Sequence, residues 1–596
     1  MLGELPTELL DQIITYLPTA QSVSSLSQTS RNIHSFVERE GWRTFSQSRF
    51  PDSEFPPYWK DASRALITLS RNWDRRAFLA QYIEPSGKIH KLPGGQEVVG
   101  WRRPKGQTMG FQPAIDSYEQ FVGTRWTDRR EVVAWSAGAE LVIRIKAKDK
   151  EVERNYRDAS REDRMGQYDL CGNSVRWWTY KPLSSVEGRD DITSVNILKP
   201  SELVSQRGAE IDRGESVVIS TANGDLQRIE VPPGPEGSVV KQYFVTNGSP
   251  VRSASVSPVM SEGSQMLVAN LSETRVALYP IDGMSKTAAL SNINAIPRAK
   301  RGCRIWSTTF LDTRHIAVGL GPSVEPLHVY EVRPDCLSDE PLRKFGLTDE
   351  FNDRTDLLGA VKPSSSVLHD MRSPSSVETT YNDPTDDSAV YSLLARGRDK
   401  IIAGTARHSL LKVFDLRMTG SRNYDYTNIG PQLQHADDNM DSAGDWNLFI
   451  NPRDQHPNSS SRGPSNWMRR SAESSIYSLS SPSPLSPFVF AGVENAVVEF
   501  NFSAALDRYP DPICSPNLRR DQLQGRATKG MRLDEALPAW VGYKGEVLNL
   551  AMYAQGTEGS DKEAMRLKVQ RAVEDTAGRE RRRIGLDERW KEAGNA

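Results

Sequence analysis

Short apolar segments repeat along most of this chain, and every repeat has the same internal order. Each unit opens with an aliphatic residue, any residue and then serine, and continues into an apolar strand ending in small residues, a turn and a third strand. One such triplet could arise by chance in a serine-rich chain, but six that lead into the same order of strands indicate a repeat architecture. The six openings are Ile115-Asp116-Ser117, Ile192-Thr193-Ser194, Val251-Arg252-Ser253, Ile305-Trp306-Ser307, Val390-Tyr391-Ser392 and Ile476-Tyr477-Ser478.

One such unit leaves both faces of its small sheet partly apolar, and radial packing of several units buries both faces. The pattern resembles a WD-repeat β-propeller; in its clearest copy, residues 401–417, Phe414-Asp415 takes the place of the family's Trp-Asp. The resemblance implies an all-β propeller over residues 76–555. We expect seven blades, with eight as the alternative, because the two ends of the domain can share a blade and cover exposed strand edges. The segments expected to form that seventh blade are residues 78–83, 97–101 and 547–553.

Three segments differ in composition from the repeats. Residues from about 346 to 387 and from about 419 to 474 are rich in Ser, Asp, Asn, Pro and Gly, so we expect disordered, mobile inserts there. Residues 556–596 are rich in charge and are expected to form a charged helical tail. The basic run Arg581-Arg582-Arg583 in this tail is either part of a solvated surface helix or a nuclear signal.

Apolar residues near the N-terminus recur at helical spacing instead. Pro6 suits the first turn of a helix, and Pro18 should end that helix. A second helical segment follows, with Gly41 as its expected C-terminal cap. The apolar residues expected on one face of the first helix are Leu5, Leu9, Leu10, Ile13 and Leu17.

The run Leu-Pro-Thr-Glu-Leu-Leu at residues 5–10, the Tyr-Leu-Pro stop at 16–18 and the Gly-Trp-Arg at 41–43 together resemble an F-box. The resemblance implies that residues 1–45 bind a Skp-type adaptor and, through it, a cullin scaffold of a ubiquitin ligase. Residues 46–75 would be a helical linker. The alternative is an ordinary helical hairpin that packs against its own chain. The residues expected to contact the adaptor are Leu5, Pro6, Leu9, Leu10, Ile13, Leu17, Leu26 and Trp42.

Charge and cysteine content exclude several other classes of function. A net charge of −2 supplies no basic field, which argues against nucleic acid as the main partner. The four cysteines are far apart, so neither a disulfide framework nor a thiolate zinc site is indicated, and a reducing compartment is expected. No stretch approaches the roughly 20 apolar residues that span a bilayer, so no membrane partner is expected. These observations predict an intracellular protein, cytoplasmic and/or nuclear.

Catalytic patterns are missing from the sequence. The eight histidines show no His-x-x-x-His spacing, and neither a Gly-x-Ser-x-Gly elbow nor a Walker-type phosphate loop is present. We therefore expect a protein that is not an enzyme and needs neither a metal nor a cofactor. A propeller hydrolase with a helical cap is the alternative from another class.

In WD-repeat substrate receptors, the residue between the aliphatic position and the serine faces the top opening of the propeller. Aromatic and arginine side chains often dominate recognition surfaces, although packing between blades is the alternative role for the aromatics. Because only two of the candidates are basic, a mixed aromatic and polar target motif is favoured over a heavily phosphorylated one. The residues that the resemblance places around this opening are Asp116, Thr193, Arg252, Trp306, Tyr391, Tyr477 and, in a turn, Arg407.

The sequence therefore predicts a small all-α F-box followed by an all-β propeller that captures a protein substrate for an SCF-type ubiquitin ligase. Ubiquitination would follow from proximity, since holding target lysines near a charged conjugating enzyme raises their effective concentration. The alternative is a non-degradative scaffold with the same two modules.

Overall fold

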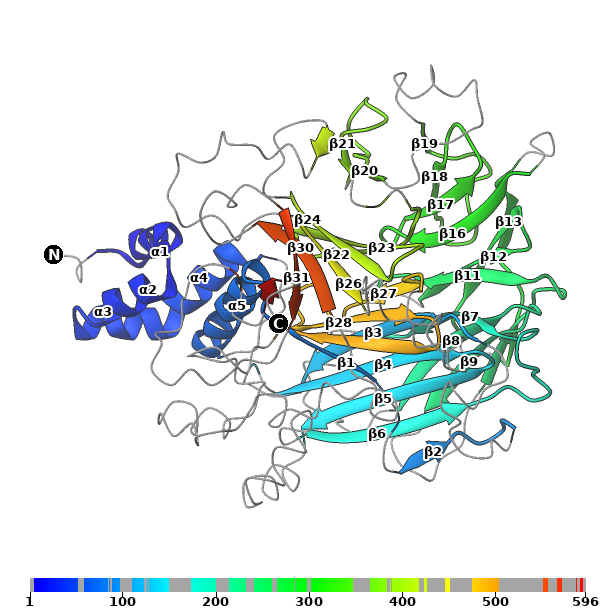
Figure 1. Cartoon of the computed structure of the whole chain (residues 1–596), viewed down its shortest axis with the longest axis horizontal. Helices are drawn as coiled ribbons and strands as arrows, with labels where there is room; N and C mark the ends of the chain where they lie inside the picture. Colours follow the sequence, from blue (N-terminus) through cyan, green and yellow to red (C-terminus); the bar gives the residue numbers. More distant parts are fainter. Residues whose placement is uncertain are drawn as a thin grey trace.

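The computed structural model consists of a helical unit at the N-terminus and a set of sheets that follow it (Figure 1). It describes residues 5–51, 58–83, 85, 88–96, 110–122, 126, 128–148, 173–199, 214–231, 241–259, 265–282, 285–296, 302–346, 365–382, 386, 388–416, 423–425, 445–450, 474–502, 550–555, 565–570, 586 and 590–592.

Five α-helices form the N-terminal part, and polar side chains cap two of them. The carbonyl of Pro6 accepts hydrogen bonds from the amides of Leu9 and Leu10 in α1, which ends before Pro18 as predicted. Thr19 and Ser30 cap the next two helices through their side-chain oxygens. The helices are α1 (Thr7–Tyr16), α2 (Ala20–Ser27), α3 (Arg31–Phe36), α4 (Trp42–Arg49) and α5 (Trp59–Asp74).

Gly41 is not the helix terminus that the sequence indicated. A π-helical turn over Val37–Gly41 joins α3 to α4, and Gly41 itself has helical backbone angles. A Cβ at this position would lie 3.3 Å from Cδ1 of Ile14. The glycine therefore allows α1 to pack closely against this turn.

Six sheets contain one predicted repeat each, which confirms the propeller. Within each sheet the main strands form an antiparallel meander, and in two sheets a short edge strand from elsewhere in the chain adds a parallel pair. The first blade consists of β3 (Ile115–Phe121), β4 (Arg129–Ala137), β5 (Glu140–Lys148) and β6 (Asn173–Tyr180), with β2 (Ile89–Lys91) at the edge. The second consists of β7 (Ile192–Ile197), β8 (Glu215–Thr221), β9 (Leu226–Val231) and β10 (Lys241–Phe244), with β14 (Lys286–Thr287) at the edge. The third consists of β11 (Val251–Val256), β12 (Met266–Leu271), β13 (Arg275–Pro280) and β15 (Ser291–Asn294).

The remaining three blades complete the set. The fourth consists of β16 (Arg304–Phe310), β17 (His315–Gly321), β18 (Leu327–Glu331) and β19 (Arg343–Phe345). The fifth consists of β22 (Val390–Arg396), β23 (Lys400–Thr405), β24 (Leu410–Asp415) and β26 (Trp446–Ile450), and is extended by β30 (Leu550–Gln555), β31 (Met565–Gln570) and β32 (Trp590–Glu592). The sixth consists of β27 (Ser478–Ser480), β28 (Phe488–Val493), β29 (Ala496–Asn501) and β1 (Leu79–Tyr82).

The serine of the repeat faces a small residue on the neighbouring strand. Ser307 pairs with Gly319, and Ser392 with Gly404. A Cβ added to Gly319 would lie only 2.8 Å from the Ser307 hydroxyl oxygen. The hydroxyl of Ser392 also donates to the carbonyl of Ile476 in the next blade, at 2.9 Å. Ser392 therefore packs against the small residue within its own blade and also forms a hydrogen bond to the next blade.

The expectation of seven blades is wrong, because segments assigned to a seventh blade complete two of the six. Strand β1, from the segment 78–83, pairs with β29 and closes the sixth blade. Strand β30, from the segment 547–553, pairs with β26 in the fifth blade. The third expected segment, 97–101, lies outside the described residues. The chain ends therefore cover edges as predicted, but within existing blades.

A smaller sheet lies between the fourth and fifth blades. It consists of β20 (Ser365–Leu368), β21 (Thr379–Asn382) and β25 (Asn423–Asp425). On one side the Phe345 ring of β19 contacts His369, with centroids 4.7 Å apart. On the other side Tyr381 contacts Phe414 of β24, at 5.5 Å. Strands β20 and β21 lie at the outside of the propeller (Figure 1).

The predicted inserts and tail contain strands within their described parts. The first insert includes β20 and β21, and the second supplies β26, the fourth strand of the fifth blade. In the tail, β31 and β32 are strands and not the expected helix, and they extend the fifth blade. The second insert also contains β25. The remaining residues of these segments either are described without a helix or strand, as over residues 369–378, or lie outside the described residues.

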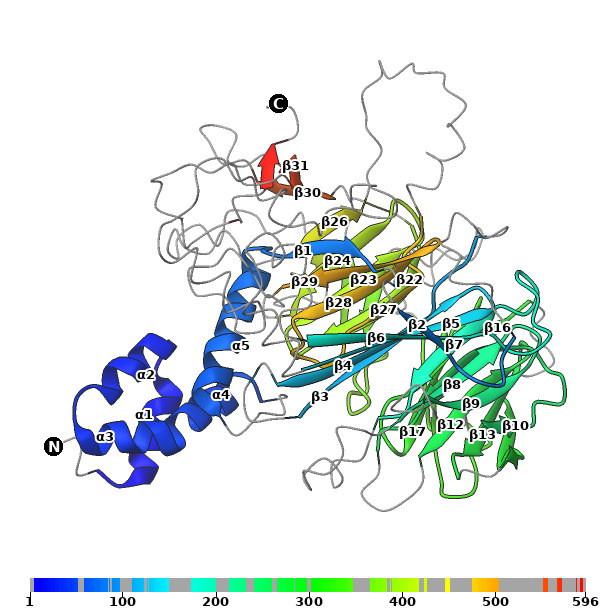
Figure 2. The same ribbon diagram turned by 90° about the horizontal axis from the view of Figure 1, so that it is seen from below.

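Helix α5 connects the two units (Figure 2). One face of this amphipathic helix buries Leu66, Leu69 and Trp73. Leu69 and Trp73 belong to a core shared with the fifth and sixth blades, and Ser63 is hydrogen-bonded to Ser46 of α4. None of the described helices is long and apolar enough to cross a membrane.

Candidate functional site

Four inner strands of the propeller share an irregularity at the residue before the repeat serine. In β7, β16 and β22 the pairing register shifts across one residue, which leaves Thr193, Trp306 and Tyr391 without a partner on the neighbouring strand. In β11 the shift spans Arg252 and Ser253. A bulge of this kind re-aims the extra side chain. The predicted position thus coincides with a backbone irregularity in four of six repeats.

The exposed candidates form two aromatic groups and two arginine sites. Trp306 is 56% exposed, and the guanidinium of Arg304 lies 3.7 Å from its ring centroid. Tyr391, also 56% exposed, approaches Tyr477 of the next blade, with ring centroids 6.3 Å apart.

The two arginines among these candidates are both exposed. Arg252 forms a 3.3 Å ion pair with Glu273, which is itself exposed. Arg407 lies in the turn between β23 and β24, where its carbonyl accepts a 2.7 Å hydrogen bond from Thr405. Both guanidinium groups are therefore open to solvent.

Asp116 and Thr193 have a different role from the predicted one. The carboxylate of Asp116 accepts hydrogen bonds from the backbone amides of Ile197, at 2.7 Å, and Ser117, at 2.8 Å. Burial raises the pKa of this carboxyl group, and the bond from the Ile197 amide opposes the rise. The hydroxyl of Thr193 donates to the carbonyl of Val251, at 2.7 Å. Both polar groups link a blade to the next one and are not left for a partner.

Sequence reasoning missed one exposed apolar residue beside this group. Leu393 is 58% exposed and lies two positions after Tyr391 on β22, so both side chains are on the same face of the strand. In the sequence, this residue could have been found from the two-residue period of a strand, counted from Tyr391. Trp306, Tyr391, Leu393 and Tyr477 offer apolar contact area, with Arg252 and Arg407 as charged positions, and these six residues are the candidates for a binding surface on the propeller rim. Among the described residues, no cluster of histidine, cysteine and acidic side chains could hold a metal ion.

Helix α1 carries apolar residues on two faces. One face is buried, with Leu10 at 5% and Ile14 at 0% exposure. Ile14 packs into a core with Val23 and Trp42, among others. The other face points outward: Leu9 is 44% and Tyr16 is 86% exposed, and Ile13 between them is half-buried. The spacing of four and seven residues aligns Leu9, Ile13 and Tyr16, which we call the outer face of α1.

The N-terminal helices match a protein-family model described as F-box-like, over residues 2–48. The N-terminal unit is an F-box-like domain. No curated protein matches this sequence. The F-box-like domain covers α1 to α4 almost completely.

Two solved structures are similar to this chain, both with low identities and low TM-scores. Raptor from Chaetomium thermophilum is 11% identical with a TM-score of 0.37, and the match covers 83% of this chain. The β-propeller domain of Cps50 (Swd1) from Myceliophteria thermophila is 8% identical with a TM-score of 0.26, and the match covers 62% of this chain and 79% of that domain. This chain spans only 36% of the Raptor chain. The propeller is accordingly defined by the strand pairing described above.

The predicted adaptor-binding residues divide into three groups within the F-box-like domain. Pro6 and Leu9 are exposed, whereas Leu5, Ile13, Leu17 and Leu26 are half-buried. Leu10 and Trp42 are both 5% exposed and belong to the interior of the domain. The placement of Leu10 and Trp42 on a contact surface is therefore corrected. Tyr16, which the sequence reading left out, is the most exposed large apolar side chain of the domain.

Proposed function

We propose that this protein is the substrate-recognition subunit of an SCF-type cullin ubiquitin ligase that works in the cytoplasm and/or nucleus. Its F-box-like domain binds a Skp-type adaptor, and its propeller binds the target protein. The outer face of α1 carries this proposal, because Leu9 and Tyr16 are exposed on a helix whose opposite face is already buried. An apolar helix face of this kind fits a hydrophobic groove on a partner.

The adaptor contact is centred on Pro6, Leu9, Ile13 and Tyr16. Leu5 directly precedes Pro6, four residues before Leu9, and extends this set. Leu17 and Leu26 pack partly against the core of the F-box-like domain, so they contribute at the margin. Leu10 and Trp42 support the surface from inside.

The propeller rim is the target-binding surface in this proposal. Its aromatic residues provide the anchors that become buried when the target binds and that dominate recognition, and its two exposed arginines provide charge. With two arginines among the candidates, the target motif is a mixed aromatic and polar segment. No side chain of this chain takes part in bond formation, since the ligase acts by holding the target lysine near a charged conjugating enzyme.

The connection between the two modules supports this mode of action. Helix α5 packs into the propeller through Trp73 and contacts α4 through Ser63. A rigid connection sets the distance between adaptor and target. The effective concentration of target lysines depends on that distance.

Affinity purification with mass spectrometry of the partners tests the proposal. Leu9→Asp places a charge on the outer face of α1 and should remove both the adaptor and the cullin. Gln47→Asp, at an exposed position of α4, adds the same charge elsewhere and should retain them. Recovery of the adaptor without a cullin contradicts the ligase role and favours the scaffold; recovery of neither by the wild type contradicts the adaptor contact.

A further inference from the structure

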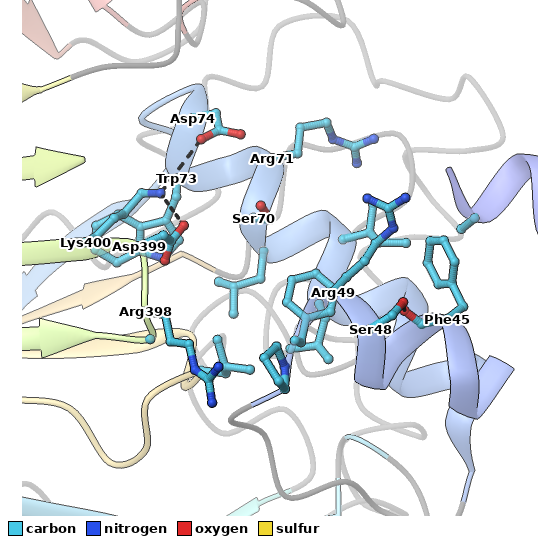
Figure 3. A pocket seen from close by; sticks show the side chains of 18 of the residues that line it. Phe45, Ser48, Arg49, Ser70, Arg71, Trp73, Asp74, Arg398, Asp399 and Lys400 are labelled. Carbon is cyan, nitrogen blue, oxygen red and sulfur yellow. Dashed lines mark hydrogen bonds and ion pairs between the residues drawn. The ribbon is translucent and has the colours of Figure 1, made fainter. Parts of the chain in front are cut away.

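A cavity of about 610 Å³ lies between the helical unit and the fifth blade (Figure 3). Its walls come from the start of α2, the end of α4, helix α5, and the turn that connects β22 to β23. Both modules of the protein therefore contribute to one site. The volume falls in the range of about 300–1,000 Å³ that is typical of small-molecule sites.

The lining is predominantly cationic. Five cationic side chains face two carboxylates, Asp74 and Asp399. Lys400 pairs with both acids, because its ammonium lies 2.9 Å from Asp399 and 4.0 Å from Asp74 (Figure 3). It also lies 3.8 Å from Asp415, outside the cavity lining. The other cations of the lining are all arginines. They are Arg49 of α4, Arg71 of α5, Arg396 at the end of β22, and Arg398 in the turn that follows.

Arg396 is the most informative of these residues. It is only 3% exposed, and its Nε and Nη1 have no hydrogen-bond partner among the described residues. Its guanidinium lies 5.3 Å from the ring of Trp73. Burial lowers the pKa of Arg396 to about 10, while the nearby Asp399 carboxylate acts in the opposite direction. A buried cation with unused donors is costly unless something pairs with it.

Other buried arginines of the propeller have such partners. Arg129 contacts the carboxylate of Glu119 at 2.9 Å, and Arg144 contacts Glu131 at 2.8 Å. Within the part of the chain that the structure describes, no carboxylate lies within ion-pairing distance of Arg396. The missing acid distinguishes this site from the structural ion pairs of the fold.

We propose that this cavity binds a small molecule that carries a phosphate group, with Arg396 and Arg398 as its principal contacts. The fork of donors on a guanidinium matches the oxygens of a phosphate, and charge-assisted bonds of this kind are among the strong ones. Hydroxyl groups of Ser48 and Ser70 line the same cavity and can donate to further oxygens. The space beyond one phosphate accommodates the rest of such a molecule.

The ligand would contact the helical unit and the propeller together. A molecule that binds only the folded arrangement stabilises it by mass action. The site therefore couples a phosphorylated small molecule to the relative position of the two modules, independently of what either module recognises.

Isothermal titration calorimetry of the full chain with inorganic pyrophosphate tests this site, with sodium chloride at matched ionic strength as the blank. We expect saturable binding that Arg398→Ala weakens at least about tenfold. Arg396→Gln should have the same effect, and thermal unfolding shows whether each variant is folded. Because Arg398 is exposed, its variant keeps the test valid if Arg396→Gln does not fold.

Arg372→Ala is the matched control, since this arginine is 90% exposed and pairs with Asp370 away from the cavity. It should leave the affinity unchanged. The absence of saturable heat would overturn the proposal, and so would binding that folded Arg398→Ala retains in full. Binding weakened equally by Arg372→Ala would reveal non-specific charge attraction and would also overturn it.

Discussion

The indole of Trp73 stacks on the ring of Phe502, with centroids 3.7 Å apart and planes 10° from parallel. The neighbouring Asn72 donates a 2.8 Å hydrogen bond to the carbonyl of Phe502. Helix α5 is thereby fixed to the end of the strand that β1 also pairs with. The place where the propeller closes is thus the place where the helical unit is attached.

Trp73→Ala should therefore destabilise the whole assembly. Trp73 is 4% exposed, and loss of a large buried aromatic side chain costs about 3–5 kcal/mol. Trp306→Ala is the matched control, because Trp306 is 56% exposed and its loss should change stability by only about 0.5 kcal/mol. Chemical unfolding of both variants measures the difference. Equal free energies of unfolding would show that α5 is not anchored by this contact.

Gly404→Ala tests the contact that explains the repeat. The added Cβ would lie 2.6 Å from Cβ of Ile476 and against the hydroxyl of Ser392, so overpacking should cost about 1–3 kcal/mol. At Gly346 the nearest atom is 3.4 Å away, which makes Gly346→Ala the control. Thermal unfolding should separate the two variants. A Gly404→Ala protein as stable as the wild type would mean that the small residue is not required by the repeat.

The repeat and the F-box resemblance were both visible in the sequence because local spacing encodes them. The sequence also indicated that the chain ends cover strand edges, but not that they do so within existing blades, since the pairing of Ala80 with Phe500 joins segments far apart in the chain. Strand β26 was hidden because its five residues lie within a long polar stretch. These strand pairings form only in the assembled propeller, so the spacing of apolar residues along the sequence does not predict them.

Helix α1 shows a different limit of sequence reasoning. Adjacent Leu9 and Leu10 satisfy the same helical spacing, yet Leu10 is buried and Leu9 is exposed. Both faces of the helix are apolar, so the periodicity alone does not decide which one packs inside. The cationic cavity had no sequence signal either, because α4, α5 and the β22–β23 turn are brought together only by the fold.

Tyr391→Ala should reduce target capture without unfolding the propeller. Tyr391 is 56% exposed, so its loss should change stability by only about 0.5 kcal/mol. Tyr243→Ala, at a tyrosine that is 49% exposed on β10, is the matched control. The proteins that still co-purify with the Leu9→Asp variant are the candidate targets. The measurement is how much of each of these proteins co-purifies with the Tyr391→Ala variant. Unchanged recovery with Tyr391→Ala would remove this residue from the target-binding surface.

Glu140→Gln should make stability less sensitive to pH. Burial raises the pKa of Glu140 from 4.5 to about 7, so the folded protein holds this proton where the unfolded chain has lost it. Stability from this group is greatest below pH 4.5 and falls as the pH rises to about 7. The variant should exceed the wild type by about 1–3 kcal/mol at pH 8 and match it at low pH. Chemical unfolding gives the free energy of unfolding of each protein as a function of pH. A constant difference between the variant and the wild type across this range would contradict the account.

Direct titration of the purified chain with a Skp-type adaptor tests the central claim. Wild-type protein should bind with a 1:1 stoichiometry, and Tyr16→Asp should weaken binding at least about tenfold, since a buried unpaired charge at an interface costs several kcal/mol. Tyr16 is 86% exposed, so the variant should unfold at the same temperature as the wild type. Binding by the wild type that is lost in a folded Tyr16→Asp protein is the predicted result. No binding by the wild type, or full binding by the variant, would contradict the assignment of the outer face of α1 as the adaptor surface.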